Sequence, residues 1–386
     1  MRVGFLYNAE LFQIPHSAPI AFELSRRYPD IQVTIIAATP AHLAFVKQLA
    51  QGYPNHSCDY QMTELPLPVR TFGKMWRGEL PPKLLTLMFN RRLLSGFHAL
   101  VVPERTSLHL KKLGLGHVKL IHSCHGAGDR PRTARADELR VRQFDFVLLH
   151  GRKHHDRWLG LDLIRPGHYA ITGYCKFDIY KPESKSPPRL FPNDNPIVLY
   201  NPHFDQQLSS WKKMGHQLLE FFSRTSRYNM IFAPHARLFD RAPQSQKTQF
   251  QQYGNAKNIL IDLGSNATMD MAYTRAADIY LGDVSSQVYE FLANPRPCIF
   301  LNPHKVEWEK DPYYYLCWQC GPVLSDVHMI ELCLEEASKS HADYVERQKE
   351  LFNYTFDLSD KPSGARGADA IAAYLSGLRV ERSHLS

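Results

Sequence analysis

Three polar residues follow an apolar run in the second half of the chain, and their spacing suits an anion. Asp283, Ser285 and Ser286 come directly after the run at 279–281, and the residues that follow have helical spacing. A strand, a polar turn and a helix present free backbone N–H groups and the positive end of the helix dipole. The serine hydroxyls would add donors for phosphate oxygens, unless Ser285 serves only as the helix cap. Glu290 lies one helical turn after Ser286, where a carboxylate can accept hydrogen bonds from ribose hydroxyls.

Two histidines follow apolar runs in the same half of the chain. His203 comes after the run at 196–200 and His235 after the run at 229–233, and a proline directly precedes each of them. A histidine at a strand end can donate a hydrogen bond to a phosphate or to a leaving group. One such histidine is more often an ordinary polar loop residue, but the repeat at two strand ends favours a shared role.

A further histidine, His125, precedes a glycine-rich turn in the first half of the chain. A neutral imidazole there could take a proton from an attacking hydroxyl, and Asp129 could orient it or contact an acceptor. A run of basic residues follows, interspersed with acids, and most of it is expected to be a solvated surface. Arg130 and Arg132 are the members that we expect to contact a phosphorylated acceptor.

The elements that would position these residues form an α/β pattern. Short apolar runs alternate with helix-like segments, which is typical of βαβ units and of parallel strands buried on both faces. The expected strands are 2–7, 32–37, 98–103, 117–122, 144–149, 169–172, 196–200, 229–233, 259–262, 279–281 and 298–301. The sequence therefore predicts an α/β fold with open parallel sheets.

A segment rich in Pro, Ser, Asp and Asn divides the pattern. We expect a domain over 1–180, a linker over 181–195 and a second domain over 196–362. Residues 363–386 are expected to form a tail with a helix that packs back on the first domain. Ligands of such sheets bind outside the carboxyl ends of the strands, so we expect a site in a cleft between the domains.

Composition narrows the possible functions. Lys and Arg number 46 against 38 Asp and Glu, a net charge of +8 with neutral His, which favours anionic partners. The basic residues are dispersed and match no nucleic-acid-binding module, so we expect no nucleic-acid partner. The N-terminus reads as a strand rather than a signal peptide, and no apolar stretch is long enough to span a bilayer. Seven irregularly spaced cysteines favour a reducing cytosol, and Cys317 and Cys320, without a second such pair, predict no metal site.

Taken in order, these motifs resemble the CDP-glycerol glycerophosphotransferase family of teichoic-acid-like polymer synthesis. The family's His-Gly-Thr-Pro-Leu-Lys loop is similar to 125–130, its Gly-Tyr-Pro-Arg-x-Asp hinge to 173–178, its Tyr-Ala-Pro-Thr strand end to 200–203, its Pro-His-Pro motif to 234–236, its Thr-Asp-Tyr-Ser-Ser motif to 282–286, and its Arg-Pro strand to 296–300. The resemblance runs from about residue 120 to residue 303 and is strongest at the paired serines.

The resemblance implies a GT-B fold, in which two Rossmann-like domains face each other across a cleft. It also implies a metal-independent, cofactor-free transfer of glycerol phosphate from a CDP-activated donor to a membrane-linked glycan or lipid, at the cytoplasmic face of the membrane. His125 would be the general base. The donor would be bound by His203, His235, Asp283, Ser285, Ser286 and Glu290.

Several residues depart from the family pattern. Ala127 and Gly128 replace Thr-Pro, and Cys175 replaces a proline. The donor could therefore be another CDP-, CMP- or UDP-linked group, as in a GT-B glycosyltransferase. A nucleotide-sugar epimerase of this fold would need cleft carboxylates, and the sequence shows no comparable set. Residues 70–94 mix aromatic, aliphatic and basic side chains, which fits contact with an anionic membrane, or alternatively a lid or a packed helix.

Overall fold

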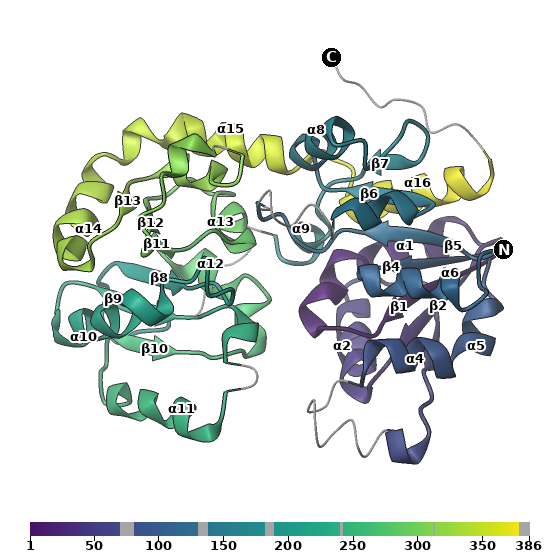
Figure 1. Ribbon diagram of the computed structural model, residues 1–386, viewed down its shortest axis with the longest axis horizontal. Coiled ribbons are helices and arrows are strands. Elements are labelled where there is room, and N and C mark those ends of the chain that lie inside the picture. Colours follow the sequence, from purple (N-terminus) through teal and green to yellow (C-terminus); the bar gives the residue numbers. More distant parts are fainter. Residues whose placement is uncertain (70–80, 130–137, 182–188, 240–241, 312, 378–386) are drawn as a thin grey trace. The chain divides into compact units, whose positions relative to one another are not determined.

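The computed structural model describes residues 1–69, 81–129, 138–181, 189–239, 242–311 and 313–377 of the chain. They fold into two compact units (Figure 1). The first consists of Met1–His125, Thr133–Lys181 and Asn353–Ser386, and the second of Gly126–Arg132 and Pro182–Phe352. By its contacts, the loop that follows His125 therefore belongs to the second unit.

The first unit is built on a seven-stranded parallel sheet with the order β3-β2-β1-β4-β5-β6-β7. Its strands are β1 (Arg2–Tyr7), β2 (Gln32–Ala37), β3 (Asp59–Met62), β4 (Ala99–Val102), β5 (Lys119–Ser123), β6 (Phe146–Leu149) and β7 (Tyr169–Ile171). Strand order changes direction between β1 and β4, which is where sheets of this topology bind ligands.

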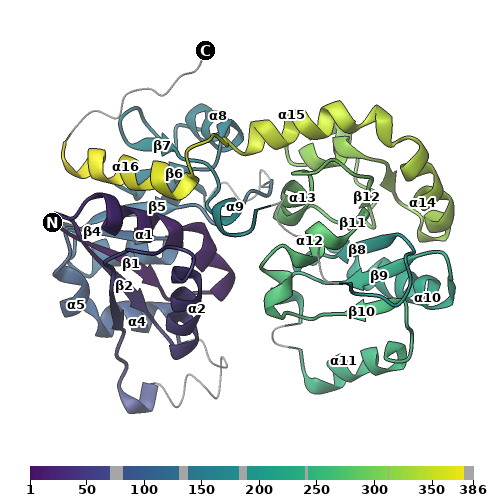
Figure 2. The same cartoon turned by 180° about the vertical axis from the view of Figure 1, so that it is seen from behind.

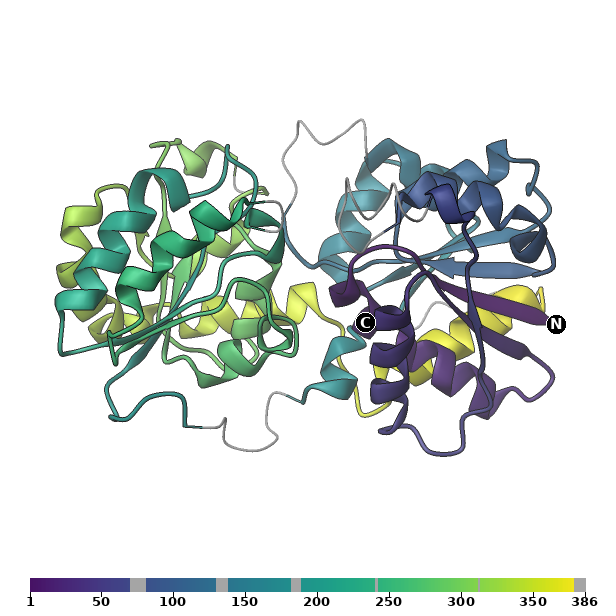
Figure 3. The same ribbon diagram turned by 90° about the horizontal axis from the view of Figure 1, so that it is seen from below.

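Helices cover both faces of this sheet (Figure 3). They are α1 (Ala18–Arg27), α2 (Pro40–Ala50), α4 (Lys83–Phe89), α5 (Arg91–Ser95), α6 (His109–Lys112), α8 (Arg152–Gly160), α9 (Lys176–Ile179) and α16 (Ser363–Leu375). Alternate residues of one strand serve opposite cores: Phe5 packs with the α1 and α16 side, and Leu6 with the α4 and α5 side. The inner strands β4 and β6 are entirely apolar because both of their faces are buried.

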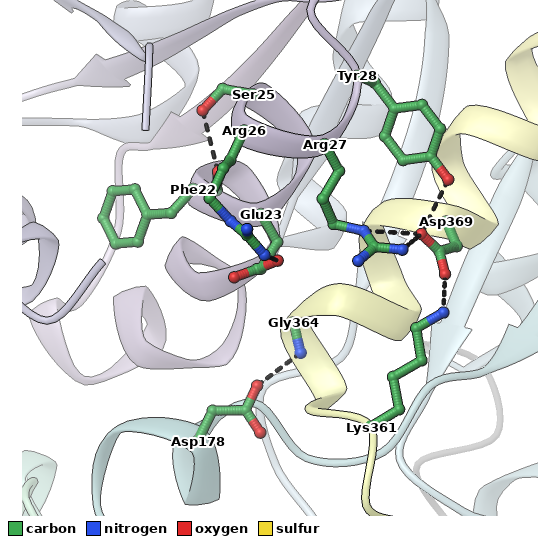
Figure 4. Close-up of polar contacts among 10 residues, drawn as sticks. All are labelled: Phe22, Glu23, Ser25, Arg26, Arg27, Tyr28, Asp178, Lys361, Gly364 and Asp369. Atoms are coloured by element: carbon green, nitrogen blue, oxygen red, sulfur yellow. Dashed lines mark hydrogen bonds and ion pairs between the residues drawn. The ribbon is translucent and has the colours of Figure 1, made fainter. Parts of the chain in front are cut away.

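The tail helix α16 lies along α1 within the first unit (Figure 2). Asp369 accepts hydrogen bonds from Arg27 and Tyr28 and pairs with Lys361 (Figure 4). These ion pairs are partly exposed, so most of the attachment comes from the buried alanine-rich face of the helix. In the first turn of α16, the backbone nitrogen of Gly364 donates a hydrogen bond of 2.6 Å to the carboxylate of Asp178.

The second unit repeats the architecture with a six-stranded parallel sheet of order β10-β9-β8-β11-β12-β13. Its strands are β8 (Ile197–Asn201), β9 (Asn229–Phe232), β10 (Ile259–Ile261), β11 (Ile279–Gly282), β12 (Cys298–Leu301) and β13 (Val323–Leu324). Its helices are α10 (His216–Arg224), α11 (Gln244–Thr248), α12 (Ala272–Ala276), α13 (Ser286–Phe291) and α14 (Ile330–Lys339), and α15 (Val345–Thr355) spans the division between the units. The order changes direction between β8 and β11.

The prediction of two α/β domains with parallel sheets is confirmed. Helix α10 begins at His216, directly after a π-helical turn over Trp211–Gly215. None of the described helices is long and apolar enough to cross a membrane.

Candidate functional site

Three predicted site residues of the second unit stand at the carboxyl ends of neighbouring strands. His235 follows β9, His203 follows β8, and Ser285 follows β11, and these strands are adjacent in the order β9-β8-β11. The rings of His203 and His235 have their centroids 5.5 Å apart. Phe204 packs against both rings, at 4.5 and 4.6 Å. The three residues therefore lie at the carboxyl end of the sheet, where the strand order changes direction between β8 and β11.

The hydrogen bonds of both histidines determine which ring nitrogen carries a proton. Nδ1 of His203 accepts from the backbone nitrogen of Asp205 at 3.1 Å, and Nδ1 of His235 accepts from that of Arg237 at 3.2 Å. A ring nitrogen that accepts has no hydrogen, so Nε2 is the donor in each neutral ring. Burial, followed by the charges of His203 and Arg237, lowers the pKa of His235 to about 3. His235 is therefore neutral at pH 7 and presents one N–H group.

Ser285 caps helix α13. Its hydroxyl oxygen accepts a hydrogen bond of 3.2 Å from the backbone nitrogen of Gln287. The capping role that the sequence left open is thus present, and the same side chain also hydrogen-bonds to the buried Tyr280. Gln287 in turn donates to the carbonyl of Thr268 at 3.4 Å, which links α13 to the 3-10 turn at Asn266–Thr268.

Asp283, at the end of β11, is fully buried. Its Oδ2 accepts hydrogen bonds from the backbone nitrogens of His203, at 2.7 Å, and Ser210, at 2.9 Å. Its Oδ1 has no partner among the residues that the structure describes. Burial raises the pKa of the Asp283 carboxyl to about 7, although the backbone of His203 and both the backbone and the side chain of Ser210 lower it. The carboxylate thus holds the loop that carries His203. The predicted contacts of Asp283 and of the buried Glu290 with a nucleotide donor stay predictions.

The loop after His125 lies against the start of α13, within the second unit. A methyl group at position 128 would stand 3.2 Å from the backbone nitrogen of Ser286, so Gly128 allows this close approach. Asp129 accepts a hydrogen bond of 2.5 Å through Oδ2 from the hydroxyl of Tyr289. Burial, followed by the charge of Asp129, raises the pKa of Tyr289 well above its usual value, so the phenol keeps its proton. Sequence reasoning missed Tyr289, whose partner lies 160 residues away in the chain.

In the first unit, His125 is oriented by a backbone carbonyl. Its Nδ1 lies 2.9 Å from the oxygen of Pro103, which can only accept, so Nδ1 carries the hydrogen. In the neutral ring the lone pair is then on Nε2, the atom that a general base uses. The amide nitrogen of Gln13 lies 3.5 Å from this atom. Pro103 therefore orients the ring, and a catalytic role for Asp129 stays a prediction.

A carboxylate that sequence reasoning also missed lies next to His125. Glu104 accepts a hydrogen bond of 2.6 Å from Gln13 and pairs with Lys83 at 3.1 Å. Burial alone would raise the pKa of Glu104, but the charges of Lys83 and His125 and the bond from Gln13 lower it. Glu104 follows β4 directly, and this position at a strand end was the signal that could have identified it.

The other predicted residues lie outside the described part of the chain or have structural surroundings. Arg130 and Arg132 lie outside the described residues, as does the segment 70–80 of the predicted membrane patch. Cys317 and Cys320 are buried free thiols, and the described residues include no His, Cys, Asp and Glu cluster that could hold a metal ion. Gly173 has a φ of +86°, and a methyl group there would meet the carbonyl of Asp357 at 2.7 Å, which agrees with a structural role.

Comparisons with known proteins support the fold. No protein-family model matches the chain, and no curated protein matches it. Among solved structures, the wall teichoic acid polymerase TagF is similar with a TM-score of 0.64 and 14% identity, over 97% of this chain and 89% of that one. S. aureus MnaA in a co-structure with UDP is similar with a TM-score of 0.64 and 12% identity, over 100% of both chains. UDP-GlcNAc 2-epimerase from Neisseria meningitidis bound to UDP-GlcNAc is similar with a TM-score of 0.57 and 14% identity, over 98% of this chain and 100% of that one. The chain therefore has the α/β fold with two parallel sheets that these structures share.

Proposed function

We propose that this chain is a transferase that moves glycerol phosphate, or a related group, from a CDP-activated donor to a membrane-linked glycan or lipid in cell-envelope polymer synthesis. The observation that carries the proposal is the group of hydrogen-bond donors at the switch point of the second sheet. Nδ1 of His203 and of His235 each accept a backbone hydrogen bond, so each ring carries a hydrogen on Nε2, and Ser285 follows the adjacent strand. Phosphate oxygens accept hydrogen bonds, so this group suits the diphosphate of a nucleotide donor.

The base in this proposal is His125. Because Pro103 accepts from Nδ1, Nε2 holds the lone pair that would take the proton of an acceptor hydroxyl as that oxygen attacks the donor phosphorus. The bond from phosphorus to the leaving nucleotide then breaks, and the nucleotide leaves with its own phosphate. The proton on His125 would be stabilised by the negative charge of Glu104, which lies close enough for each charge to affect the other.

Contact with a membrane is part of the same proposal. The described end of the predicted patch, helix α4, exposes Leu84 by 42%, Met88 by 47% and Phe89 by 50%. The exposed Arg91 and Arg92 follow directly. Apolar side chains beside cations suit the interface of an anionic bilayer, so we place the chain at the inner face of the cell membrane.

A second candidate is an enzyme that uses another nucleotide sugar, CMP- or UDP-linked. The match to the UDP co-structure of MnaA over the full length of both chains favours it. The same imidazole and hydroxyl donors would bind the diphosphate of UDP, since that group is common to both nucleotides. The two candidates therefore differ at the base, and a direct comparison of nucleotides separates them.

The experiment that tests the proposal is a thermal-shift screen of the full chain with CDP, CMP, UDP and GDP. A ligand that binds the folded state raises the melting temperature, and the effect grows with the ratio of its concentration to its Kd. The proposal predicts the largest shift with CDP and a smaller one with CMP, which lacks the second phosphate. A larger shift with UDP would favour the second candidate, and equal indifference to all four would contradict both.

A further inference from the structure

A group of buried imidazoles lies at the carboxyl edge of the first sheet, in the same unit as His125. His16 ends the 3-10 helix η1 (Leu11–His16), and His150 comes directly after β6. Their rings are inclined by 29° with centroids 6.2 Å apart, and the centroid of the Tyr174 ring lies 5.0 Å from that of His16 and 4.8 Å from that of His150. His16 is 6% exposed and His150 is 4% exposed. Two histidines so deeply buried need partners for their polar atoms.

The bond of His150 to the backbone determines what its other nitrogen can do. Nε2 lies 2.9 Å from the carbonyl oxygen of Cys124 and therefore carries the hydrogen. Burial lowers the pKa of His150 to about 4, so the ring is neutral at pH 7 and Nδ1 holds a lone pair. This Nδ1 is buried and has no partner among the residues that the structure describes. It can be satisfied only by a group that donates a hydrogen.

Two more unsatisfied atoms belong to η1. The side-chain oxygen of Gln13 and Nδ1 of His16 are buried, and the described part of the chain offers neither of them a partner. Gln13 donates to Glu104 at 2.6 Å through its nitrogen, which fixes its oxygen as the free acceptor. The group thus contains at least two acceptors that require hydrogen donors, and Gln13 also lies 3.5 Å from Nε2 of His125.

The electrostatic environment of these rings is positive. Burial, followed by the charge of Lys176, lowers the pKa of His16 well below its usual value, and burial, followed by the charges of His125 and Lys153, lowers that of His150. Both lysines are 6% exposed. Buried positive charge favours a negatively charged ligand. A ligand that combines hydroxyl hydrogens with a negative charge suits both the acceptors and the charges of this place.

We propose that Gln13, His16 and His150 form a subsite beside His125 for the hydroxyl groups of a phosphorylated polyol or sugar. A simple anion such as sulfate has no hydrogen to give to these acceptors, and an uncharged polyol gains nothing from the lysines. The inference rests on the proposed function only in one respect: it makes the occupant of this subsite the acceptor whose hydroxyl His125 would deprotonate. The binding chemistry itself depends on the first unit alone.

The test is a titration of the full chain, labelled with ¹⁵N in histidine, followed through the imidazole nitrogens. Glycerol 3-phosphate serves as the hydroxyl-bearing anion, and sulfate at equal concentration serves as the anion without a hydrogen. The resonance of His150 Nδ1 should move toward the value of a hydrogen-bonded nitrogen with glycerol 3-phosphate and stay in place with sulfate. Loss of one neutral hydrogen bond of about 1 kcal/mol corresponds to a factor of roughly five in affinity.

His150→Phe keeps the ring and its contact with Tyr174 but removes the acceptor. It should weaken glycerol 3-phosphate about fivefold, measured through the His16 resonance, and Gln13→Met should do the same without touching the ring cluster. His122→Phe is the matched control, because His122 is equally buried and bonds the carbonyl of Val102, among apolar neighbours. It should leave the affinity unchanged.

Three outcomes would overturn the inference: equal movement with sulfate, no movement with glycerol 3-phosphate, or full affinity in both His150→Phe and Gln13→Met. Titration of CDP into the same sample separates this failure from failure of the proposed function. If CDP moves the resonances of His203 and His235 while glycerol 3-phosphate moves nothing, the subsite is wrong and the transferase stands. If glycerol 3-phosphate moves the His150 resonance and CDP moves no resonance, the subsite stands and the proposed transferase is wrong.

Discussion

The hydroxyl of Tyr289 donates a hydrogen bond of 2.5 Å to the carboxylate of Asp129, and this bond fastens the loop after β5 to helix α13. Tyr289 is fully buried, so its side chain cannot follow the loop if the loop moves. Gly128, one residue before Asp129, lies against the backbone of Ser286. Only two residues of chain separate Gly128 from His125, the proposed base. The bond therefore holds the residues that directly follow the proposed base against the helix that begins at the paired serines.

Tyr289→Phe tests this link. The substitution removes the hydrogen bond from Tyr289 to the Asp129 carboxylate, and we expect turnover to fall about tenfold or more while nucleotide affinity stays within about twofold. Tyr273→Phe is the matched control, since its hydroxyl donates to Asp262 at 2.7 Å in the same unit and has no assigned role in the site. Equal loss of turnover in both variants would show that the Tyr289 bond contributes only to the stability of the fold.

Asp283 should make folding stability depend on pH. Burial raises its pKa to about 7 in the folded chain, from 3.8 for a free aspartate side chain. Between these pH values the folded state binds more protons than the unfolded state, so the free energy of unfolding falls as pH rises from about 4 to 7. The loss is of the order of 4 kcal/mol. Urea unfolding of the wild type at several pH values measures it.

Asp283→Asn is the variant that identifies the group responsible. Asparagine keeps an oxygen to accept from His203 and Ser210 but cannot ionise. We expect it to be more stable than the wild type at pH 7 and to show a flatter pH dependence. An unchanged slope would assign the pH dependence to other groups.

Separate substitutions of Ser285 and Ser286 should distinguish the effect of helix capping from the effect of ligand binding. Ser285→Ala removes the cap of α13 and should cost about 1 kcal/mol of stability, because the backbone nitrogen of Gln287 loses its acceptor. Ser286→Ala removes no cap and should lower the affinity for CDP with little change in melting temperature. Thermal unfolding with and without CDP measures both effects. Unchanged CDP affinity in the double variant would place the phosphate site elsewhere.

Helix α4 should contribute to membrane binding. Replacing Met88 and Phe89 by Ser removes two large exposed side chains and should reduce sedimentation with anionic phospholipid vesicles severalfold, without loss of stability. Leu332, 50% exposed on α14, gives a control by substitution to Ser. Equal sedimentation of all variants would exclude α4 as the contact.

The sequence was most informative where both faces of a strand are buried. β1, β2 and β12 have the predicted bounds because nearly all of their residues are buried, and most of these are apolar. β3, with the sequence DYQM, was missed because it lies at the sheet edge and is only half buried. β13 was missed because it has only two residues, Val323 and Leu324.

The candidate site was predictable at strand ends but not in its contacts. His203, His235 and Ser285 could be proposed because polar residues after apolar runs collect at one sheet edge. Which ring nitrogen of each histidine carries the proton could not be predicted, since this depends on backbone groups such as the carbonyl of Pro103 and the nitrogen of Arg237. No local pattern relates such an atom to a side chain that reaches it only in the folded chain.

Calorimetric titration of CDP into the wild type and into His235→Ala gives the sharpest test of the donor site. If the Nε2–H of His235 binds the diphosphate, the variant should bind CDP at least tenfold more weakly and CMP almost as well as the wild type does. Equal affinity of the wild type and His235→Ala for CDP would show that this imidazole does not bind the diphosphate, and the proposed donor site would be wrong.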